Sequence, residues 1–264
     1  MPLVEVNGVK TFYESKGEGK PLLMVHGAGG CYANWSIQLS ELSKNLRAIA
    51  LDLPGHGKSE HLKEKATIER YADHIADFLK QIKLDKAVIA GHSMGGAIVQ
   101  QLALKRPQLF EKLIIVDSSA YFPDPRDSRV PGSPENIRDL IRTQPLEVVG
   151  RAIMSRLFSK KTLEKGHMGS MLKYLLPDSV FDPMIMVNDF EAGRGFDIRE
   201  KIKDINIPTL ILAGSDSMIP ISAAQFLHER IKGSALEIIQ DSGHMIMLEK
   251  PEEFNEAILR FIGT

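Results

Sequence analysis

The sequence predicts an α/β domain in which helices cover both faces of a mostly parallel central sheet. Continuous apolar runs recur along the chain and are typical of strands buried on both faces, and amphipathic helical patterns stand between them. Such alternation favours a parallel sheet with right-handed crossovers. Each apolar run ends in small or polar residues. Because ligands bind beyond the carboxyl ends of strands in these sheets, functional residues are expected there.

The strands can be placed in order from the N-terminus. The segment VEVNGVKTFYES alternates apolar and polar residues around Asn7 and Gly8, a favoured hairpin turn. The buried strands then follow as PLLMVHG, LRAIALDLPGHG, KAVIAGHS, KLIIVDSS, PTLILAGSD and ALEIIQDSGH. A hairpin is therefore expected ahead of the buried strands.

The helices between these strands carry their own start signals. The segment TIERYADHIADFLKQI has one apolar stripe, with Thr67 as the expected N-cap. Ser222 and Gln225 have the spacing of a capping box. Pro251 is expected to open a last helix, because proline suits the first helical position.

The alternation breaks between residues 120 and 204. A segment rich in proline and charge is followed by helical patterns with no strand until IPTLIL. Because strand and helix alternation then resumes, we expect a helical cap at 120–204 inserted into a core domain of residues 1–119 and 205–264. Methionines in the insertion suit an adaptable apolar pocket or simply pack its helices: Met154, Met168, Met171, Met184 and Met186.

Composition excludes several classes of partner. The chain of 264 residues has 33 lysines and arginines against 34 aspartates and glutamates, a formal net charge of -1. We therefore expect neither nucleic acid nor membrane partners, and a small neutral or weakly polar ligand instead. No apolar span of membrane length is present, and the one cysteine, Cys31, cannot form an internal disulfide. A cytoplasmic location is expected, and the oligomeric state is not predicted.

The segment AGHSMGGA places a single hydroxyl, Ser93, among glycines between a predicted strand and a predicted helix. Residues 91–95 read G-x-S-x-G, and this context predicts a nucleophile elbow. A direct passage from strand to helix strains the backbone at the serine, and side chains at 91 and 95 would collide. The next helix also directs free amide groups at the same spot.

A serine nucleophile needs a base, and the base needs a carboxylate to orient it. His244 is the preferred base, because it follows the last strand and completes the chain order Ser, Asp, His. His26 and His56 follow earlier strands and are less suited. Asp216, which ends the preceding strand, is the first choice for the carboxylate, and Asp117 is the alternative, with a structural role in its turn as its competing interpretation.

Two backbone amides are predicted to bind the oxyanion. One is the amide of Met94, directly after the serine, and the other is that of Ala28 in the loop HGAGG, with Gly29 as a second possibility. A phosphate-binding loop is the competing interpretation of HGAGG. The chain lacks the accompanying Lys-Ser/Thr pair and the G-x-G-x-x-G pattern.

The segments HGAGG, LDLPGHGKS, GHSMGG, LAGSDSMIP and SGHMIMLEKPEEF, in this order, resemble those of the α/β-hydrolase-fold superfamily, in its serine-nucleophile, esterase-like branch. The resemblance spans most of the chain outside the insertion. It implies a triad of Ser93, His244 and Asp216 beneath a helical lid. It also implies chemistry that requires no metal and no organic cofactor.

The expected reaction is hydrolysis of a small carboxylic ester through an acyl-enzyme. Carbon-carbon hydrolysis of ring-fission diketones is the main alternative, although Met245 stands where those enzymes usually carry an aromatic residue. Lactonase, perhydrolase and peptidase chemistry, and a slow-turnover ligand receptor on the same fold, also stay open. Candidate substrate-binding residues are Gly29, Trp35, Met218 and Met245.

Overall fold

A computed structural model describes residues 2–122, 134–166, 171, 173–174 and 183–263 of the chain. Its centre is an eight-stranded sheet in the order β1-β2-β4-β3-β5-β6-β7-β8. The strands are β1 (Leu3–Val6), β2 (Val9–Lys16), β3 (Pro21–Val25), β4 (Arg47–Leu51), β5 (Ala87–His92), β6 (Phe110–Val116), β7 (Thr209–Gly214) and β8 (Ala235–Ile239). Strand β2 pairs antiparallel with both β1 and β4, and the neighbours from β4 to β8 pair parallel, which confirms the predicted fold class.

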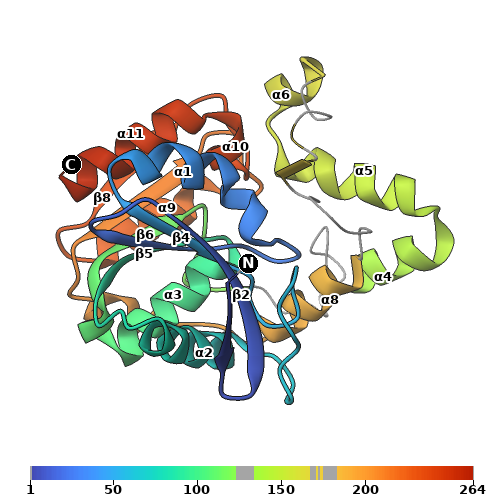
Figure 1. Cartoon of the computed structure of the whole chain (residues 1–264). Coiled ribbons are helices and arrows are strands. Elements are labelled where there is room, and N and C mark those ends of the chain that lie inside the picture. Colours follow the sequence, from blue (N-terminus) through green and yellow to red (C-terminus); the bar gives the residue numbers. More distant parts are fainter. Residues whose placement is uncertain (1, 123–133, 167–170, 172, 175–182, 264) are drawn as a thin grey trace.

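Helices cover both faces of the sheet and divide the core into two layers (Figure 1). Apolar residues of α2 (Ile68–Gln81), α3 (Met94–Lys105) and α9 (Ile221–Arg230) pack in one layer. Those of α1 (Ser36–Glu41), α10 (Ile246–Glu249) and α11 (Pro251–Ile262) pack in the other. Short 3-10 helices lie at Tyr32–Trp35, Leu42–Lys44, Pro107–Leu109 and Ile202–Asp204. Within the described ranges, every helix is too short or too polar to cross a lipid bilayer.

The predicted helix starts are confirmed in two of three cases. The Thr67 side chain caps α2 by accepting a backbone hydrogen bond, and Pro251 occupies the first turn of α11. The capping box at Ser222 and Gln225 is wrong. Helix α9 begins two residues earlier than a Ser222 cap requires, its N-cap is Pro220, and no side chain caps it. Pro220 provides no side-chain acceptor and only sets the entry angle of the chain.

The segment predicted to be an insertion, residues 120–204, lies between β6 and β7 in the chain. Its described helices are α4 (Pro134–Thr143), α5 (Leu146–Leu157), α6 (Lys160–Glu164) and α8 (Pro183–Ala192), and they stand to one side of the sheet (Figure 1). A bridge between Tyr121 and Asp197 joins its two ends. Of the insertion's methionines, Met168 and the side chain of Met154 lie outside the described part of the chain.

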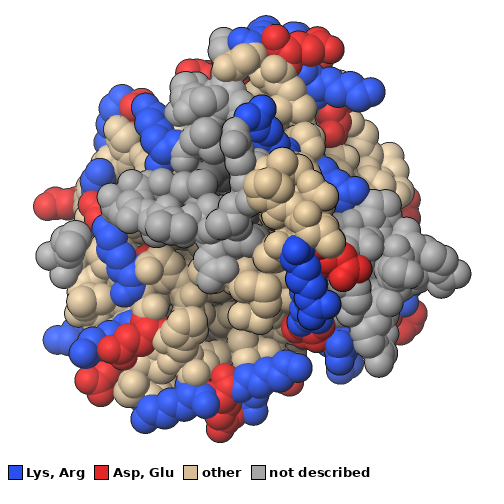
Figure 2. All heavy atoms as spheres, turned by 90° about the vertical axis from the view of Figure 1, so that its right-hand side faces the viewer, with Lys and Arg blue, Asp and Glu red and all other residues tan. Residues whose placement is uncertain are grey.

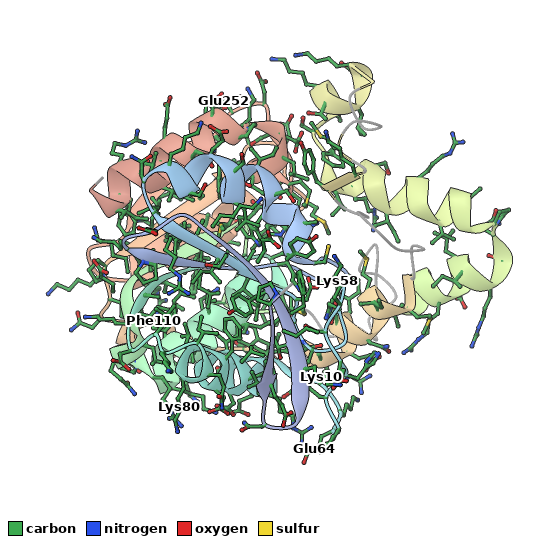
Figure 3. All side chains as sticks on the ribbon, viewed as in Figure 1. Lys10, Lys58, Glu64, Lys80, Phe110 and Glu252 are labelled. Atoms are coloured by element: carbon green, nitrogen blue, oxygen red, sulfur yellow. The ribbon has the colours of Figure 1, made fainter. Side chains whose placement is uncertain are left out.

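The insertion stands on the side where the parallel strands end. Phe110, at the start of β6, and Lys58, in the loop that follows β4, lie on opposite sides of the molecule, with Lys58 toward the insertion (Figure 3). On the face that carries the insertion, charged side chains lie mainly around the rim, and uncharged residues surround a hollow near the middle (Figure 2). The predicted functional residues at the strand ends therefore face the insertion.

Candidate active site

Ser93 lies between β5 and α3 in a backbone conformation that side chains rarely adopt. Its φ is 54° and its ψ is -118°. The Ser93 amide donates to the carbonyl of Val116 at 2.9 Å. The Ser93 carbonyl accepts from the Ser118 hydroxyl at 2.7 Å and from the Ala97 amide at 3.2 Å. These bonds hold the strained turn, which leaves the half-buried side chain above the end of the sheet.

Two glycines beside Ser93 are required because backbone atoms pass too close for any side chain. A Cβ atom at Gly91 would lie 2.2 Å from the carbonyl oxygen of Gly95. One at Gly95 would lie 2.4 Å from the carbonyl oxygen of His26. Larger residues at either position would force strand and helix apart, as the sequence pattern predicts.

His244 is bound to a buried carboxylate, that of Asp117. His244 follows the last strand and is 4% exposed, and Asp117 is 2% exposed. The Nδ1 atom of His244 makes a short hydrogen bond to Oδ2 of Asp117, which also accepts from the Ser217 hydroxyl. Oδ1 of Asp117 accepts from the Gly214 amide at 3.2 Å. Three donors thus satisfy the carboxylate, as burial of such a group demands.

Asp216, the expected partner of His244, does not contact it, and the register of the sheet explains why. His92 at the end of β5 pairs with Val116 at the end of β6, so the next residues, Ser93 and Asp117, leave the sheet at one level. Strand β7 continues beyond that level before it ends. Asp216 then follows on a turn where its side chain is exposed. The carboxylate beside His244 is therefore the alternative, Asp117.

His244 lies against the strand that carries Ser93. The His92 and His244 rings are 4.5 Å apart between centroids, and Nε2 of His92 donates to the carbonyl of His244 at 2.9 Å. The Ser93 hydroxyl makes no hydrogen bond to the described residues, and Nε2 of His244 also has none there. The structure thus brings Ser93, His244 and Asp117 to one edge of the sheet. The Ser93 hydroxyl and Nε2 of His244 have no hydrogen-bond partner among the described residues and are available to react.

The loop of residues 26–30 lies directly against Ser93. A Cβ atom at Gly27 would lie 3.0 Å from Cβ of Ser93, a contact so tight that one of the two residues would have to shift. Ala28 is the next residue, and its amide makes no hydrogen bond to the described residues. Met94 is the first residue of α3, where the amide has no partner within the helix. Both predicted oxyanion donors therefore stand at the Ser93 turn, and neither has an acceptor within the described ranges of the chain.

Gly29 differs from Ala28 because its amide is already occupied. It donates to Oδ2 of Asp189, in α8 of the insertion, at 2.7 Å. A Cβ atom at Gly29 would lie 3.3 Å from the side chain of Met186, which covers the loop from the same helix. Gly29 is therefore not a free donor. The periodic pattern of the insertion gives no signal for Asp189, because its partner Gly29 is 160 residues away in the sequence and meets it only in the folded chain.

The other strand-end histidines have structural partners. His26 is fully buried, its Nδ1 atom donates to the carbonyl of Gly27 at 2.8 Å, and its Nε2 atom accepts from the Leu53 amide at 3.0 Å. Burial, and then the neighbouring His56, hold the pKa of His26 well below its usual value. His26 is therefore a neutral group that fixes the loop, and it has no nitrogen left to serve Ser93.

Asp52 holds the loop after β4. Its carboxylate accepts from the amides of Tyr32 at 2.7 Å and Lys58 at 2.8 Å. Burial is the largest influence on Asp52 and raises its pKa, against the two backbone hydrogen bonds that lower it. The loop that carries His56 is thereby fixed in place beneath the insertion.

A second carboxylate that the sequence did not indicate, Glu249, joins the His244 loop to the insertion. Oε1 of Glu249 accepts from the amide of Gly243 at 2.7 Å. Its Oε2 accepts from the Ser159 amide at 2.9 Å and from the Thr162 hydroxyl at 2.6 Å. The turn before His244 is thus fastened to α6.

Two of the three predicted substrate-binding side chains lie in the hydrophobic core. Trp35 is fully buried in the core layer of α1 and α11, where its ring lies 6.1 Å from that of Phe254, so this prediction is wrong. Met245 is 3% exposed and packs in the same layer, so it is core as well. Met218 is 48% exposed, and its role stays a prediction. Among the described residues, no group of three or more His, Cys, Asp or Glu could hold a metal ion.

Known proteins share both the sequence pattern and the fold. The family profile for the alpha/beta hydrolase fold matches residues 20–251. A 2-hydroxy-6-oxo-6-(2'-aminophenyl)hexa-2,4-dienoic acid hydrolase from Metapseudomonas resinovorans is 27% identical over 267 residues, covering 98% of this chain and 90% of its own.

Solved structures agree with this match. A thermophilic esterase from Thermogutta terrifontis is 26% identical, with a TM-score of 0.84 over 99% of this chain and 97% of its own. An enol-lactonase from Burkholderia xenovorans LB400 is 22% identical and shares the fold over 100% of both chains, with a TM-score of 0.88. Relatives with several hydrolytic activities thus share this scaffold. The elbow, the sheet order and the profile match agree, and the chain belongs to the alpha/beta hydrolase fold family.

Proposed function

We propose that the protein is a serine hydrolase that cleaves a small carboxylic ester through an acyl-enzyme. The single observation that carries the proposal is the buried His244–Asp117 pair at the sheet level where the strained Ser93 turn begins. A histidine that binds a carboxylate through Nδ1 keeps Nε2 for the serine proton, which is the division of labour that acyl transfer needs.

Each group then has one task in the proposed reaction. His244 takes the proton of Ser93 as the hydroxyl attacks the ester carbonyl, and Asp117 stabilises the imidazolium that forms. The amides of Ala28 and Met94 bind the oxyanion of the tetrahedral intermediate. His244 returns the proton to the leaving alcohol, and water then displaces the acyl group by the same steps.

Hydrolysis of para-nitrophenyl acetate and butyrate tests the proposal, with wild type beside Ser93→Ala. We expect turnover in the wild type and a loss of about 10⁶-fold in the variant, because the nucleophile and its base act as one unit. Circular dichroism must show that both proteins are folded. Equal activity in the two proteins would refute the assignment of Ser93.

Carbon-carbon hydrolysis is the second candidate, and it is supported by the relative from Metapseudomonas resinovorans, whose name describes that chemistry. The two candidates differ in the bond that breaks, so the same preparations should be given a ring-fission diketone and an ester at equal concentration. Faster turnover of the diketone would favour the second candidate. Faster turnover of the ester would favour the first.

A further inference from the structure

The insertion places one buried carboxylate among donors of the core. Asp189 in α8 is 2% exposed. Its Oδ2 atom accepts from the Gly29 amide at 2.7 Å and from Nε2 of His56 at 2.8 Å. Its Oδ1 atom has a longer contact, 3.4 Å, with the Tyr71 hydroxyl. All three donors belong to the core, so this carboxylate fastens the insertion to the loops beside Ser93.

A buried carboxylate is costly unless a charged or hydrogen-bonding partner offsets its lost hydration. His56 is 2% exposed, and its second ring nitrogen, Nδ1, lies 3.2 Å from the carbonyl of Pro54. Both nitrogens of His56 face acceptors, and only the imidazolium can donate to both. Burial lowers the pKa of His56, but Asp189, the Pro54 carbonyl and Asp52 together raise it above its usual value.

The loop next to Asp189 needs external contacts to hold one conformation. Residues 27–30 read GAGG, and glycine restricts the backbone less than any other residue. The peptide between Gly27 and Ala28 is held through its carbonyl oxygen. The Gly27 carbonyl accepts from Nδ1 of His26 at 2.8 Å and from the Gly30 amide at 3.1 Å. Because a peptide unit is planar, these bonds also set the direction of the Ala28 amide.

The peptide between Ala28 and Gly29 is held by Asp189. The Gly29 amide belongs to that peptide, and its bond to Oδ2 of Asp189 fixes the plane. Gly29 has a φ of +65°, so the chain turns sharply at this point. Without the acceptor on α8, the Ala28–Gly29 peptide is free to rotate. That rotation displaces Gly30, whose amide holds the Gly27 carbonyl and with it the peptide that carries the Ala28 amide.

We propose that Asp189 is a positioning residue that completes the oxyanion site from the insertion, by holding the peptide that follows Ala28. The proposal rests on the proposed function, since it assigns Asp189 to the oxyanion donor of that reaction. It implies that the site is fully formed only when α8 is seated on the core. The carboxylate oxygen accepts the Gly29 amide and so holds the loop, and the negative charge attracts the imidazolium of His56.

Substitutions at Asp189 separate these two tasks. Asp189→Asn keeps an oxygen acceptor for Gly29 and removes the charge, whereas Asp189→Ala removes both. We expect kcat on para-nitrophenyl butyrate to stay within a few-fold of wild type in Asp189→Asn and to fall about a hundredfold in Asp189→Ala, with little change in KM. Both variants should unfold at a lower temperature than wild type, because both lose the attraction to His56.

Inhibition by phenylboronic acid reports on the oxyanion site independently of turnover. The Ser93 oxygen adds to boron, its proton passes to His244, and the tetrahedral boronate anion occupies the place of the intermediate. The inhibition constant should rise in Asp189→Ala by about the factor lost in kcat/KM, and it should stay near the wild-type value in Asp189→Asn. A merely structural role would lower stability without this parallel change.

Glu191→Ala is the matched control, since Glu191 is on the same helix and pairs with Arg138 and Arg194 within the insertion. If Asp189→Ala does not fold, Asp189→Leu fills similar space without an acceptor and replaces it. A wild type that hydrolyses the ester while Asp189→Ala and Glu191→Ala are equally active would overturn this inference alone. A folded wild type with no turnover would overturn the proposed function, and this inference with it.

Discussion

Two buried histidine–aspartate pairs lie near the carboxyl edge of the sheet, and they differ in which nitrogens they use. His244 binds Asp117 through Nδ1, and its Nε2 atom has no hydrogen bond to the described residues. His56 binds Asp189 through Nε2 and faces the Pro54 carbonyl with Nδ1. The first pair keeps one nitrogen for a proton transfer, and the second has both nitrogens engaged.

The pairs also differ in what they join. Asp117 and His244 both follow strands of the core, whose register is fixed by backbone hydrogen bonds. Asp189 comes from the insertion, so its pair connects two parts of the molecule. The same two side chains thus suit proton transfer in one place and attachment in the other. The surrounding acceptors, not the residue types, decide between these tasks.

The sharpest test of this comparison replaces each histidine by glutamine. His244→Gln should lower kcat for para-nitrophenyl butyrate by about 10⁶-fold, because the base and nucleophile act together. His56→Gln should stay within about tenfold of wild type in kcat but lower the melting temperature by roughly 10 °C, since breaking a buried pair costs about 3 kcal/mol or more. Enzyme assays and thermal unfolding of both variants measure the two effects. A comparable loss of kcat in both variants would contradict the division of tasks.

The next test concerns which aspartate orients His244. Asp117→Asn should lower kcat by about 10⁴-fold, as expected when the imidazole loses the carboxylate that fixes its tautomer. Asp216→Asn should leave kcat near the wild-type value, because its side chain is exposed and His244 binds another residue. Steady-state kinetics on both folded variants measures the two effects. A large loss in Asp216→Asn and a small one in Asp117→Asn would show that Asp216 orients His244.

The smallest expected effect is a change of stability with pH. Because Asp189 and its neighbours raise the pKa of His56, the pair stabilises the fold fully below pH about 6.5. That contribution is lost as the pH rises through the raised pKa. The gap in melting temperature between wild type and His56→Gln should therefore shrink from about pH 6 to about pH 9. A constant gap would show that the pair does not gain a proton on folding.

His74 provides a contrast of opposite sign. Burial lowers the pKa of His74 to about 4, although Asp77 opposes the shift, and its Nε2 atom lies 2.9 Å from the Thr11 hydroxyl. A histidine kept neutral in the fold loses its stabilising contribution as the pH falls below its unfolded pKa of about 6.5. The gap between wild type and His74→Gln should thus shrink toward acid, which thermal unfolding from about pH 7 to about pH 4 measures.

Most of the fold could be predicted because it depends on local patterns. The apolar runs predicted the buried strands, and the Asn7–Gly8 turn has the positive φ values, 50° and 77°, that a tight hairpin needs. The collisions predicted at residues 91 and 95 follow from the strand–serine–helix passage alone. The capping box of α9 could not be trusted in the same way, because a two-residue pattern does not fix where a helix begins.

The candidate site was predictable only in part. Ser93 and His244 follow from their places after apolar runs, whereas Asp117 and Asp216 both follow such runs. Asp117 comes directly after its strand, as Ser93 does, and this equal spacing was the available signal. Trp35 shows the opposite failure, because a large apolar residue near a strand end can pack on either side of the chain.

The sequence by itself determined the sheet, the elbow and the set of chemical groups, because each depends on neighbours along the chain. Only the tertiary structure decided which carboxylate meets which histidine. The pairing of β5 with β6 brings Asp117 level with Ser93, and the return of α8 brings Asp189 to Gly29. Both contacts join residues distant in sequence, and the energy of a buried charge depends on partners that only the folded chain brings within hydrogen-bond distance.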